Sequence, residues 1–374
     1  MMRFDMRLIA HFEWYLPAVT YAVCALGLAT LYSATYDPGG EMSPLVARQL
    51  AWLAMGMLGM LTVLMLDYRL LERAAYALYA VGVILLLLVP VFGVVGGGAR
   101  RWLNIGPFTL QPSEPMKILL IIALARFYSR AAAGSRRLGV VRGLLLPLAI
   151  TAIPCVAILL QPDLGTVCVF GIVYVSMAFI AGARLTPFVT VFVAALASGP
   201  VLWRYLKPYQ QQRIMTFLDP ENDPLGAGYH VIQSRIAVGS GQLWGKGFLQ
   251  GTQNQLHFLP EQHTDFIFSV FAEEWGFVGG LLLLSLYLAI LLRGVFIATR
   301  SRDTFGILVS GGVLALLFWQ ATVNIGMTTG TLPVVGIPLP LFSYGGSSLL
   351  SFLIGIGIIM SVQMRRFTFS RREL

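Results

Sequence analysis

Apolar segments of about 20 residues recur along almost the whole of this 374-residue chain, and about 20 residues is the length that a helix needs to cross the hydrocarbon of a bilayer. Hydrophobic residues make up 57% of the sequence and charged residues only 11%, and the mean hydropathy is +0.77. A soluble domain carries roughly 25% charged residues. The strands of a membrane barrel would alternate between apolar and polar residues. We therefore expect an all-α, polytopic membrane protein.

The apolar segments predict ten transmembrane helices. An even number places both termini on one side of the membrane, and arginine is concentrated in both tails and in alternate loops. Because positively charged loops stay in the cytoplasm, we expect cytoplasmic N- and C-termini. The ten predicted helices cover residues 14–34, 45–66, 74–95, 113–128, 142–160, 165–181, 186–205, 265–292, 305–327 and 342–364.

One polar loop, residues 206–264, is much longer than the others and joins the seventh and eighth predicted helices. The predicted topology makes this loop extracytoplasmic, and residues 1–374, loop included, are expected to form a single membrane domain. Polar segments of this length are usually functional or disordered. Within the loop, Tyr229, Ile232 and Ile236 fall on one helical face. That pattern is typical of a helix in the membrane interface or packed on the ends of the spans.

Several classes of function find no support in the sequence. The net charge of +9 follows the membrane topology and so does not indicate nucleic-acid binding. The four histidines show no metal-ligand spacing. The stretch GSGQLWGKG, residues 239–247, lacks the glycine spacing of a nucleotide-binding P-loop, and glycine rather than Ser or Thr follows its lysine.

The stretch LPEQHTDFIFSVFAEEWG, residues 259–276, places Asp265 where the long polar loop meets an apolar run. Charged groups are costly within a bilayer, so a carboxylate at this depth is a functional-site candidate by default. The alternative is that Asp265 only caps the following helix, because aspartate is a favoured N-cap and complements the helix dipole. Glu273 and Glu274 lie deeper in the same span, either to seal a polar core or to bind a partner.

Three further polar clusters lie at the predicted outer ends of spans, each beside a proline or glycine: residues 100–117, 161–166 and 333–348. A break near a span frees backbone groups and can shape a cavity. Since a Lys–Asp pair is the least costly way to hold both charges within a membrane, we expect Lys117 and Asp163 to pair. The candidate substrate-binding residues from these clusters are Arg100, Arg101, Glu114, Lys117, Asp163, Ser343 and Ser347.

Six segments that span nearly the whole chain resemble, in order, the motifs of the SEDS family (shape, elongation, division and sporulation). They are RRWLNIGPFTLQPSE, QPDLGT, TFLDPENDPLGAGYHVIQS, GSGQLWGKG, LPEQHTDFIFSVFAEEWG and GIPLPLFSYGGSS. The short N-terminal tail and the GIPLP run are similar to the elongation members of the family rather than to the division paralogue FtsW. In the resemblance, the family's essential acid falls on Asp265, and its cavity lysine and aspartate fall on Lys117 and Asp163.

The resemblance implies a ten-helix protein of the bacterial inner membrane that acts in cell elongation and rod-shape maintenance. Its implied activity is that of a peptidoglycan glycosyltransferase, with lipid II, an undecaprenyl-pyrophosphate-linked disaccharide peptide, as substrate. The implied partners are a class B penicillin-binding protein, which is a transpeptidase with one membrane helix, and the rod-complex proteins.

In such a reaction a sugar hydroxyl attacks an anomeric carbon that carries a lipid pyrophosphate. A carboxylate within about 3 Å of that hydroxyl can accept its proton, and we expect Asp265 to be this general base. Fixed cations or a metal ion can stabilise the leaving pyrophosphate. Arg213 joins the cations above as a candidate, and Glu261 is a further candidate substrate contact. A divalent cation, Mg²⁺ or Mn²⁺, is compatible with this site, since Mg²⁺ typically uses one or two carboxylates plus phosphates. No organic cofactor is expected.

Two other hypotheses stay open at this point. A lipid-linked sugar flippase or transporter would also need charged groups within a multi-span fold. A scaffold that only recruits the transpeptidase would not need them for chemistry. The polar residues gather at the predicted outer ends of the spans rather than at the bilayer midplane, and this distribution favours the enzyme over the transporter.

Overall fold

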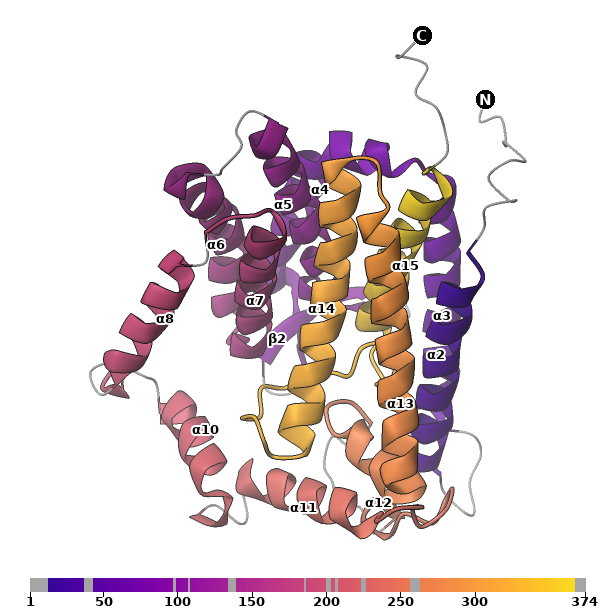
Figure 1. The fold of residues 1–374 in the computed structure, drawn as a ribbon. Helices are drawn as coiled ribbons and strands as arrows, with labels where there is room; N and C mark the ends of the chain where they lie inside the picture. Colours follow the sequence, from indigo (N-terminus) through magenta and orange to yellow (C-terminus); the bar gives the residue numbers. More distant parts are fainter. Residues whose placement is uncertain are drawn as a thin grey trace.

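The computed structural model describes residues 13–36, 43–96, 99–106, 108–133, 139–184, 186–199, 203–205, 208–222, 227–255 and 263–366. Long helices run side by side as a bundle, and shorter helices lie across one end of it (Figure 1). The bundle helices are α2 (Tyr15–Ala34), α3 (Pro44–Met65), α4 (Tyr68–Phe92), α5 (Ser113–Ala133), α6 (Leu146–Leu159) with the π-helical turn η1 (Val141–Leu145) before it, α7 (Leu164–Ile180), α13 (Ile267–Thr299), α14 (Thr304–Thr328) and α15 (Gly346–Met364). To one side lies α8 (Thr186–Ala197), and the end is covered by α10 (Pro208–Leu218), η2 (Pro220–Asn222), α11 (Ala227–Ser240) and α12 (Thr252–Gln255).

Seven helical segments of the described chain are long and apolar enough to cross a membrane: α2, α3, α4, η1 with α6, α13, α14 and α15. This makes the chain a multi-pass membrane protein, as its composition predicts. The predicted segments 113–128, 165–181 and 186–205 correspond to α5, α7 and α8.

Capping residues determine where several helices begin. The side chains of Ser43, Asp67 and Asp303 each accept a hydrogen bond from a backbone N–H in the first turn that follows. The predicted start of the third helix at residue 74 is wrong, because Asp67 caps the helix at Tyr68 and the charged first turns are helical as well. Hydropathy alone leaves those charged turns out of the predicted helix, whereas the capping bond of Asp67 shows that the helix begins before them.

A small antiparallel sheet interrupts the helical pattern between α4 and α5. Its strands are β1 (Val94–Gly96), β2 (Ala99–Ile105) and β3 (Phe108–Leu110), in the order β1-β2-β3. Trp102 pairs with Val94, and Ile105 pairs with Phe108 across a turn in which Gly106 has a φ of 60°. The expectation of an all-helical chain is therefore wrong for this stretch, whose strands are too short to show a clear alternation.

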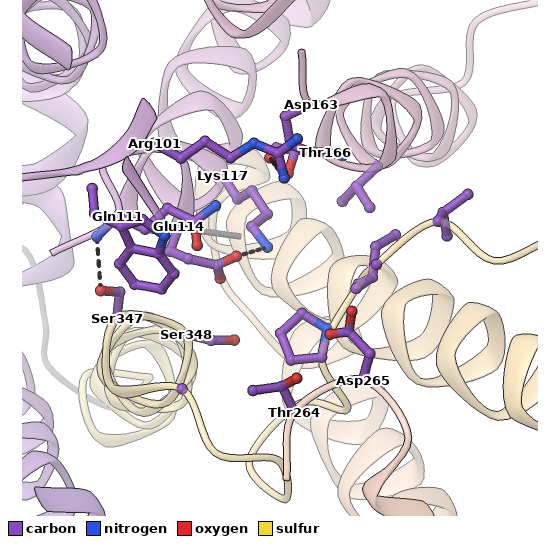
Figure 2. Close-up of a pocket in the computed structure, with 18 of the residues that line it drawn as sticks. Arg101, Gln111, Glu114, Lys117, Asp163, Thr166, Thr264, Asp265, Ser347 and Ser348 are labelled. Atoms are coloured by element: carbon purple, nitrogen blue, oxygen red, sulfur yellow. Dashed lines mark hydrogen bonds and ion pairs between the residues drawn. The ribbon is translucent and has the colours of Figure 1, made fainter. Parts of the chain in front are cut away.

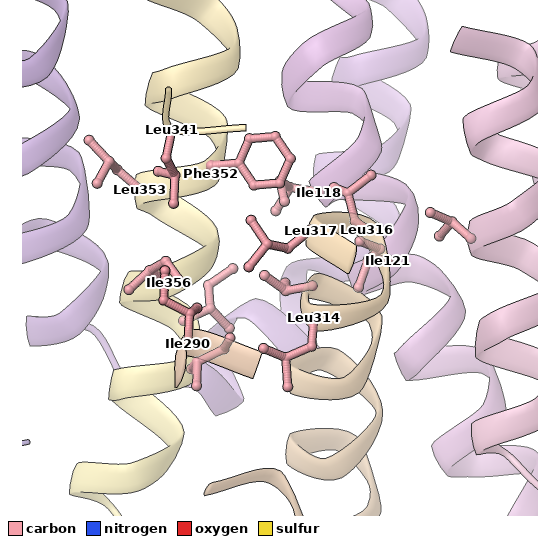
Figure 3. Close-up of a cluster of buried hydrophobic side chains, with 14 of the residues drawn as sticks. Ile118, Ile121, Ile290, Leu314, Leu316, Leu317, Leu341, Phe352, Leu353 and Ile356 are labelled. Carbon is pink, nitrogen blue, oxygen red and sulfur yellow. The ribbon is translucent and has the colours of Figure 1, made fainter. Parts of the chain in front are cut away.

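The core lies where α5, α13, α14 and α15 meet, and it is built of branched aliphatic and aromatic side chains (Figure 3). Helices α3 and α15 approach closely because small residues face the neighbour: a Cβ on Gly357 would lie 2.8 Å from the Met60 carbonyl oxygen, and one on Gly56 would lie 2.4 Å from the Leu353 side chain. Small residues at helix contacts are how membrane helices gain van der Waals packing.

Helix α11 contains the amphipathic stretch of the long loop and packs against α13 and α14. Its buried residues are Val231, Ser234 and Ala237, whereas Ile236 is 45% exposed. The face that packs on the spans is therefore not that of Tyr229, Ile232 and Ile236, and the contacts of α11 support the interpretation of a helix packed on the ends of the spans. Ser234 explains the difference, because its hydroxyl bonds to the Thr328 carbonyl and to Ser269 and so faces inward.

A kink in α13 at Gly276 joins this helix to the glycine-rich stretch. Gly276 has a φ of 63°, so the helical hydrogen-bond ladder breaks there. The stretch replaces the lost partners: the N–H groups of Phe277 and Val278 donate to the carbonyls of Gln242 and Leu243, at 2.8 and 3.1 Å. The glycines of GSGQLWGKG therefore serve a close backbone approach rather than phosphate binding.

Gly276→Ala should lower the stability of the protein by more than about 1 kcal/mol, because alanine disfavours a positive φ. In addition, its Cβ would lie 2.3 Å from the Gly245 nitrogen. Gly280→Ala on the same helix is the matched control, since the nearest atom to its Cβ is 4.0 Å away. Thermal unfolding in detergent measures both variants, and equal midpoints would contradict this account of the kink.

Candidate active site

A cavity of about 510 Å³ opens among the β-strands, α5, the start of α7, the turn before α13 and the segment between α14 and α15. Asp265 and Thr264 lie on one side of it, and Arg101, Asp163 and Thr166 lie on the opposite side (Figure 2). Segments far apart in the sequence thus meet at one site. Five of the predicted site residues besides Asp265 line this cavity: Arg101, Glu114, Lys117, Asp163 and Ser347.

Lys117 lies one turn into α5 and is 2% exposed. Its Nζ donates to Glu114 Oε1 at 2.8 Å and to Gln320 Oε1 at 3.1 Å. The pair that holds the ammonium is therefore Lys117–Glu114, and the expected pairing of Lys117 with Asp163 is wrong. Glu114 lies one helical turn from Lys117, and that spacing makes a local ion pair available.

Asp163 caps α7 and faces β2. Its Oδ1 accepts from the Thr166 N–H at 3.2 Å, and its Oδ2 accepts from the Thr166 hydroxyl at 2.9 Å. Arg101 Nη1 lies 4.0 Å from Asp163 Oδ2, and Arg101 also donates to the carbonyls of Gln161 and Pro162 at 3.1 and 2.5 Å. Arg101 thus ties the strand to the turn before α7 and leaves a guanidinium edge in the cavity wall.

Asp265 lies in the turn immediately before α13. The residue at the N-cap position is Phe266, with no side-chain capping bond. The helix-cap alternative for Asp265 thus loses its main support, since Asp265 precedes that position by one residue. The carboxylate lines the cavity, and a Cβ on Gly336 would lie 3.4 Å from its Oδ2. The backbone carbonyl of Asp265 accepts from Asn324 Nδ2 at 2.9 Å.

The first turn of α15 supplies the hydroxyl side of the site. Ser347 and Ser348 line the cavity, and Ser347 Oγ accepts from the Gln111 N–H at 2.9 Å (Figure 2). Ser343 is buried outside the lining and has a structural role, since its Oγ accepts from the Leu339 N–H at 2.8 Å. The two serines therefore differ: Ser347 borders the cavity, whereas Ser343 shapes the turn.

The remaining predicted contacts divide into two groups. Arg100 does not line the cavity; it is exposed and points back toward the Pro90 carbonyl. The side chain of Arg213 and all of Glu261 lie outside the described residues, so their predicted roles stay predictions. Sequence reasoning missed Gln111, Thr166, Thr264, Tyr344 and Ser348 as lining residues, although each lies within or beside a motif that it singled out.

Glu273 and Glu274 are buried away from the cavity and hold the loop to α13. Lys246 Nζ lies 2.6 Å from Glu273 Oε1, which also accepts from the Gln253 N–H at 3.1 Å. Ser33 of α2 donates to Glu274. Of the two roles considered for this pair, these contacts favour the polar core within the chain.

Of the cavity-lining residues that the structure describes, three are acids, Asp163, Asp265 and Glu114, and two are bases, Arg101 and Lys117. Among the described residues, no group of three His, Cys, Asp or Glu side chains is arranged to hold a metal ion without other ligands. A metal here would need ligands from a bound substrate, because carboxylates and phosphate oxygens together are the set that Mg²⁺ prefers.

Comparison with known proteins connects this site to a family. A family model described as "Cell cycle protein", of the FtsW/RodA/SpoVE group, matches residues 13–367. Peptidoglycan glycosyltransferase MrdB of Escherichia coli (strain K12) is 44% identical over 346 residues, covering 91% of this chain and 92% of the relative. Peptidoglycan glycosyltransferase RodA of Treponema pallidum (strain Nichols) is 34% identical over 433 residues, covering 96% of this chain and 99% of the relative.

Solved structures give the same result for the fold. A chain from a study of "Structural coordination of polymerization and crosslinking by a peptidoglycan synthase complex" has a TM-score of 0.81 and 36% identity, covering 96% of this chain and 99% of that chain. The rod shape determining protein RodA of Thermus thermophilus has a TM-score of 0.71 and 32% identity, covering 96% and 98%. The resemblance stated from the motifs is confirmed, and the chain belongs to the FtsW/RodA/SpoVE family of cell cycle proteins.

Proposed function

We propose that this protein is a peptidoglycan glycosyltransferase that polymerises lipid II into glycan strands during cell elongation. One observation carries the proposal: the Asp265 carboxylate shares a cavity of about 510 Å³ with Lys117, Arg101 and Asp163. Such a cavity offers a proton acceptor and fixed positive charge to one ligand. Relatives that cover most of the chain are named as enzymes of this class.

Asp265 acts as the general base in this proposal. The acceptor hydroxyl loses its proton to the carboxylate while its oxygen bonds to the anomeric carbon of the donor sugar. The bond from that carbon to the pyrophosphate oxygen breaks, and undecaprenyl pyrophosphate leaves with the electron pair. Single displacement converts an α-linked donor into a β-linked glycan. Lys117 and Arg101 lie where they can offset the negative charge of the leaving group.

A divalent cation, Mg²⁺ or Mn²⁺, completes the charge balance in this proposal. Three carboxylates and two cationic side chains give the described lining of the cavity an excess of acids before an anionic substrate enters. Asp163 would hold such an ion together with the pyrophosphate oxygens, and Asp265 would remain the proton acceptor. The ion would supply further stabilisation of the leaving group.

The proposed topology has ten membrane helices, with α5, α7 and α8 added to the seven apolar helices. Both termini are placed in the cytoplasm of a bacterium, and the 206–264 loop is placed outside the inner membrane. The arginine distribution supports this orientation. Asp265 then lies near the outer surface, where a lipid-anchored sugar meets water.

A class B penicillin-binding protein is the proposed partner, and the wider rod-complex proteins join it. Support comes from the structural neighbour, which was studied as part of a peptidoglycan synthase complex. The partner would cross-link the strands that this chain polymerises.

Polymerisation in detergent is the test of the proposed function. The purified protein, alone and with its partner, is incubated with lipid II and Mg²⁺, and glycan chain length is measured on a gel. We expect chain growth, because no membrane and hence no translocation is required. EDTA should stop chain growth and added Mg²⁺ or Mn²⁺ should restore it. A flippase or a scaffold predicts no chain growth under any of these conditions.

A further inference from the structure

Two amide side chains of α14, Gln320 and Asn324, bond to residues that line the cavity but do not line it themselves. Both are 0% exposed, and they lie one helical turn apart on the same face. A buried amide is costly unless its groups are hydrogen-bonded. Neither residue belongs to a motif that the sequence singled out, so their contacts decide what they do.

Asn324 holds the backbone on the Asp265 side of the cavity. Its Nδ2 donates to the Asp265 carbonyl at 2.9 Å and to the Ile337 carbonyl at 2.7 Å. Both donors of one amide group are thus used on two segments that are 72 residues apart in sequence, as the numbering shows. The Asn324 amide therefore ties the segment of residues 335–338 to the turn that carries Asp265.

Gln320 makes the matching connection to Lys117. Its Oε1 accepts from Lys117 Nζ at 3.1 Å, and its Nε2 donates to the Pro338 carbonyl at 3.2 Å. The 335–338 segment is thus held at two adjacent carbonyls, that of Pro338 by Gln320 and that of Ile337 by Asn324. The same segment reaches α7, since a Cβ on Gly165 would lie 2.4 Å from the Val335 carbonyl oxygen.

We infer that Gln320 and Asn324 are positioning residues that fix the Asp265 carboxylate relative to the Lys117 ammonium across the substrate cavity. The inference rests on the proposed role of Asp265 as general base. Neither amide needs to touch substrate; each acts through a group that does. A general base works only within hydrogen-bond reach of its hydroxyl, and a misplacement of about 1 Å can cost about 10²-fold in rate.

Asn324→Asp is the main test, because it keeps the shape of the side chain and removes both donors. We expect kcat for lipid II polymerisation to fall about tenfold to a hundredfold with KM nearly unchanged. Gln320→Glu keeps the acceptor for Lys117 and loses only the donor to Pro338, and it should lower kcat in the same way. It tests the inference if Asn324→Asp does not fold. Thr322→Val on the same helix is the control, since its exposed hydroxyl donates to the Phe318 carbonyl of its own helix.

A double-mutant cycle separates positioning from simple structural damage. In an Asp265→Asn background, Asn324→Asp should cause little further loss of kcat, because no general base remains to be positioned. If folded Asn324→Asp and Gln320→Glu keep the parental kcat, the inference is wrong. It is also wrong if their losses of activity add to that of Asp265→Asn. If Asp265→Asn itself keeps full activity, the general-base assignment fails instead, and the two failures are therefore distinguishable.

Discussion

Replacing Asp265 by asparagine should lower the rate of glycan polymerisation by about 10²–10⁴-fold, which is the usual contribution of a positioned general base. Asparagine matches aspartate in shape but cannot accept the proton of the attacking hydroxyl. Because the Asp265 carbonyl, rather than its carboxylate, accepts the bond from Asn324, the substitution leaves that contact in place. We therefore expect a folded protein that binds lipid II and does not extend it.

Asp67→Asn is the matched control for this experiment. Asp67 caps α4 and lies outside the cavity lining. Its replacement should leave both the unfolding midpoint and the polymerisation rate close to those of the parent. Full-rate chain growth by purified Asp265→Asn would remove Asp265 from the mechanism, whatever the control shows.

Much of the fold follows from local sequence properties. Apolar runs predict the long helices because a bilayer requires continuous apolar length, and caps such as Asp67 determine their starts. The main residues of the site can also be predicted from local sequence. Asp265, Lys117 and Asp163 stand out because charge is rare in such a chain, and the structure brings all three to one cavity.

What the sequence does not reveal is which distant groups meet. The partner of Lys117 could not be chosen from composition, since Glu114, one turn away, and Asp163, at the cap of α7, are both carboxylates near the span ends. Gln320 and Asn324 are ordinary polar residues in an apolar helix until their contacts with residues 335–338 are known. The inward face of α11 likewise depends on the hydrogen bond from Ser234 to the Thr328 carbonyl. Hydrophobic periodicity cannot predict that bond, because serine is polar.

Lys117→Met should destabilise the folded protein by about 3–5 kcal/mol, the cost of removing one partner from a buried ion pair. Lys117 is 2% exposed and Glu114 4% exposed, so the carboxylate left behind has no ready access to water. One of its oxygens, Oε2, already has no hydrogen-bond partner among the described residues, which makes the loss of the ammonium more costly. Denaturant unfolding in detergent, followed by tryptophan fluorescence, measures the effect.

The double variant Glu114→Gln with Lys117→Met shows whether the pair also serves catalysis. Removal of both charges takes away the uncompensated carboxylate, so most of the lost stability should return. Activity should stay low, because the ammonium that faces the leaving pyrophosphate is still missing.

Recovery of stability together with activity would mean that Lys117 serves the fold alone. Loss of stability in the double variant equal to that in Lys117→Met would mean that burial of the Glu114 charge is not what the lysine offsets. The expected separation, restored stability without restored polymerisation, follows only if one ammonium both neutralises Glu114 and faces the substrate.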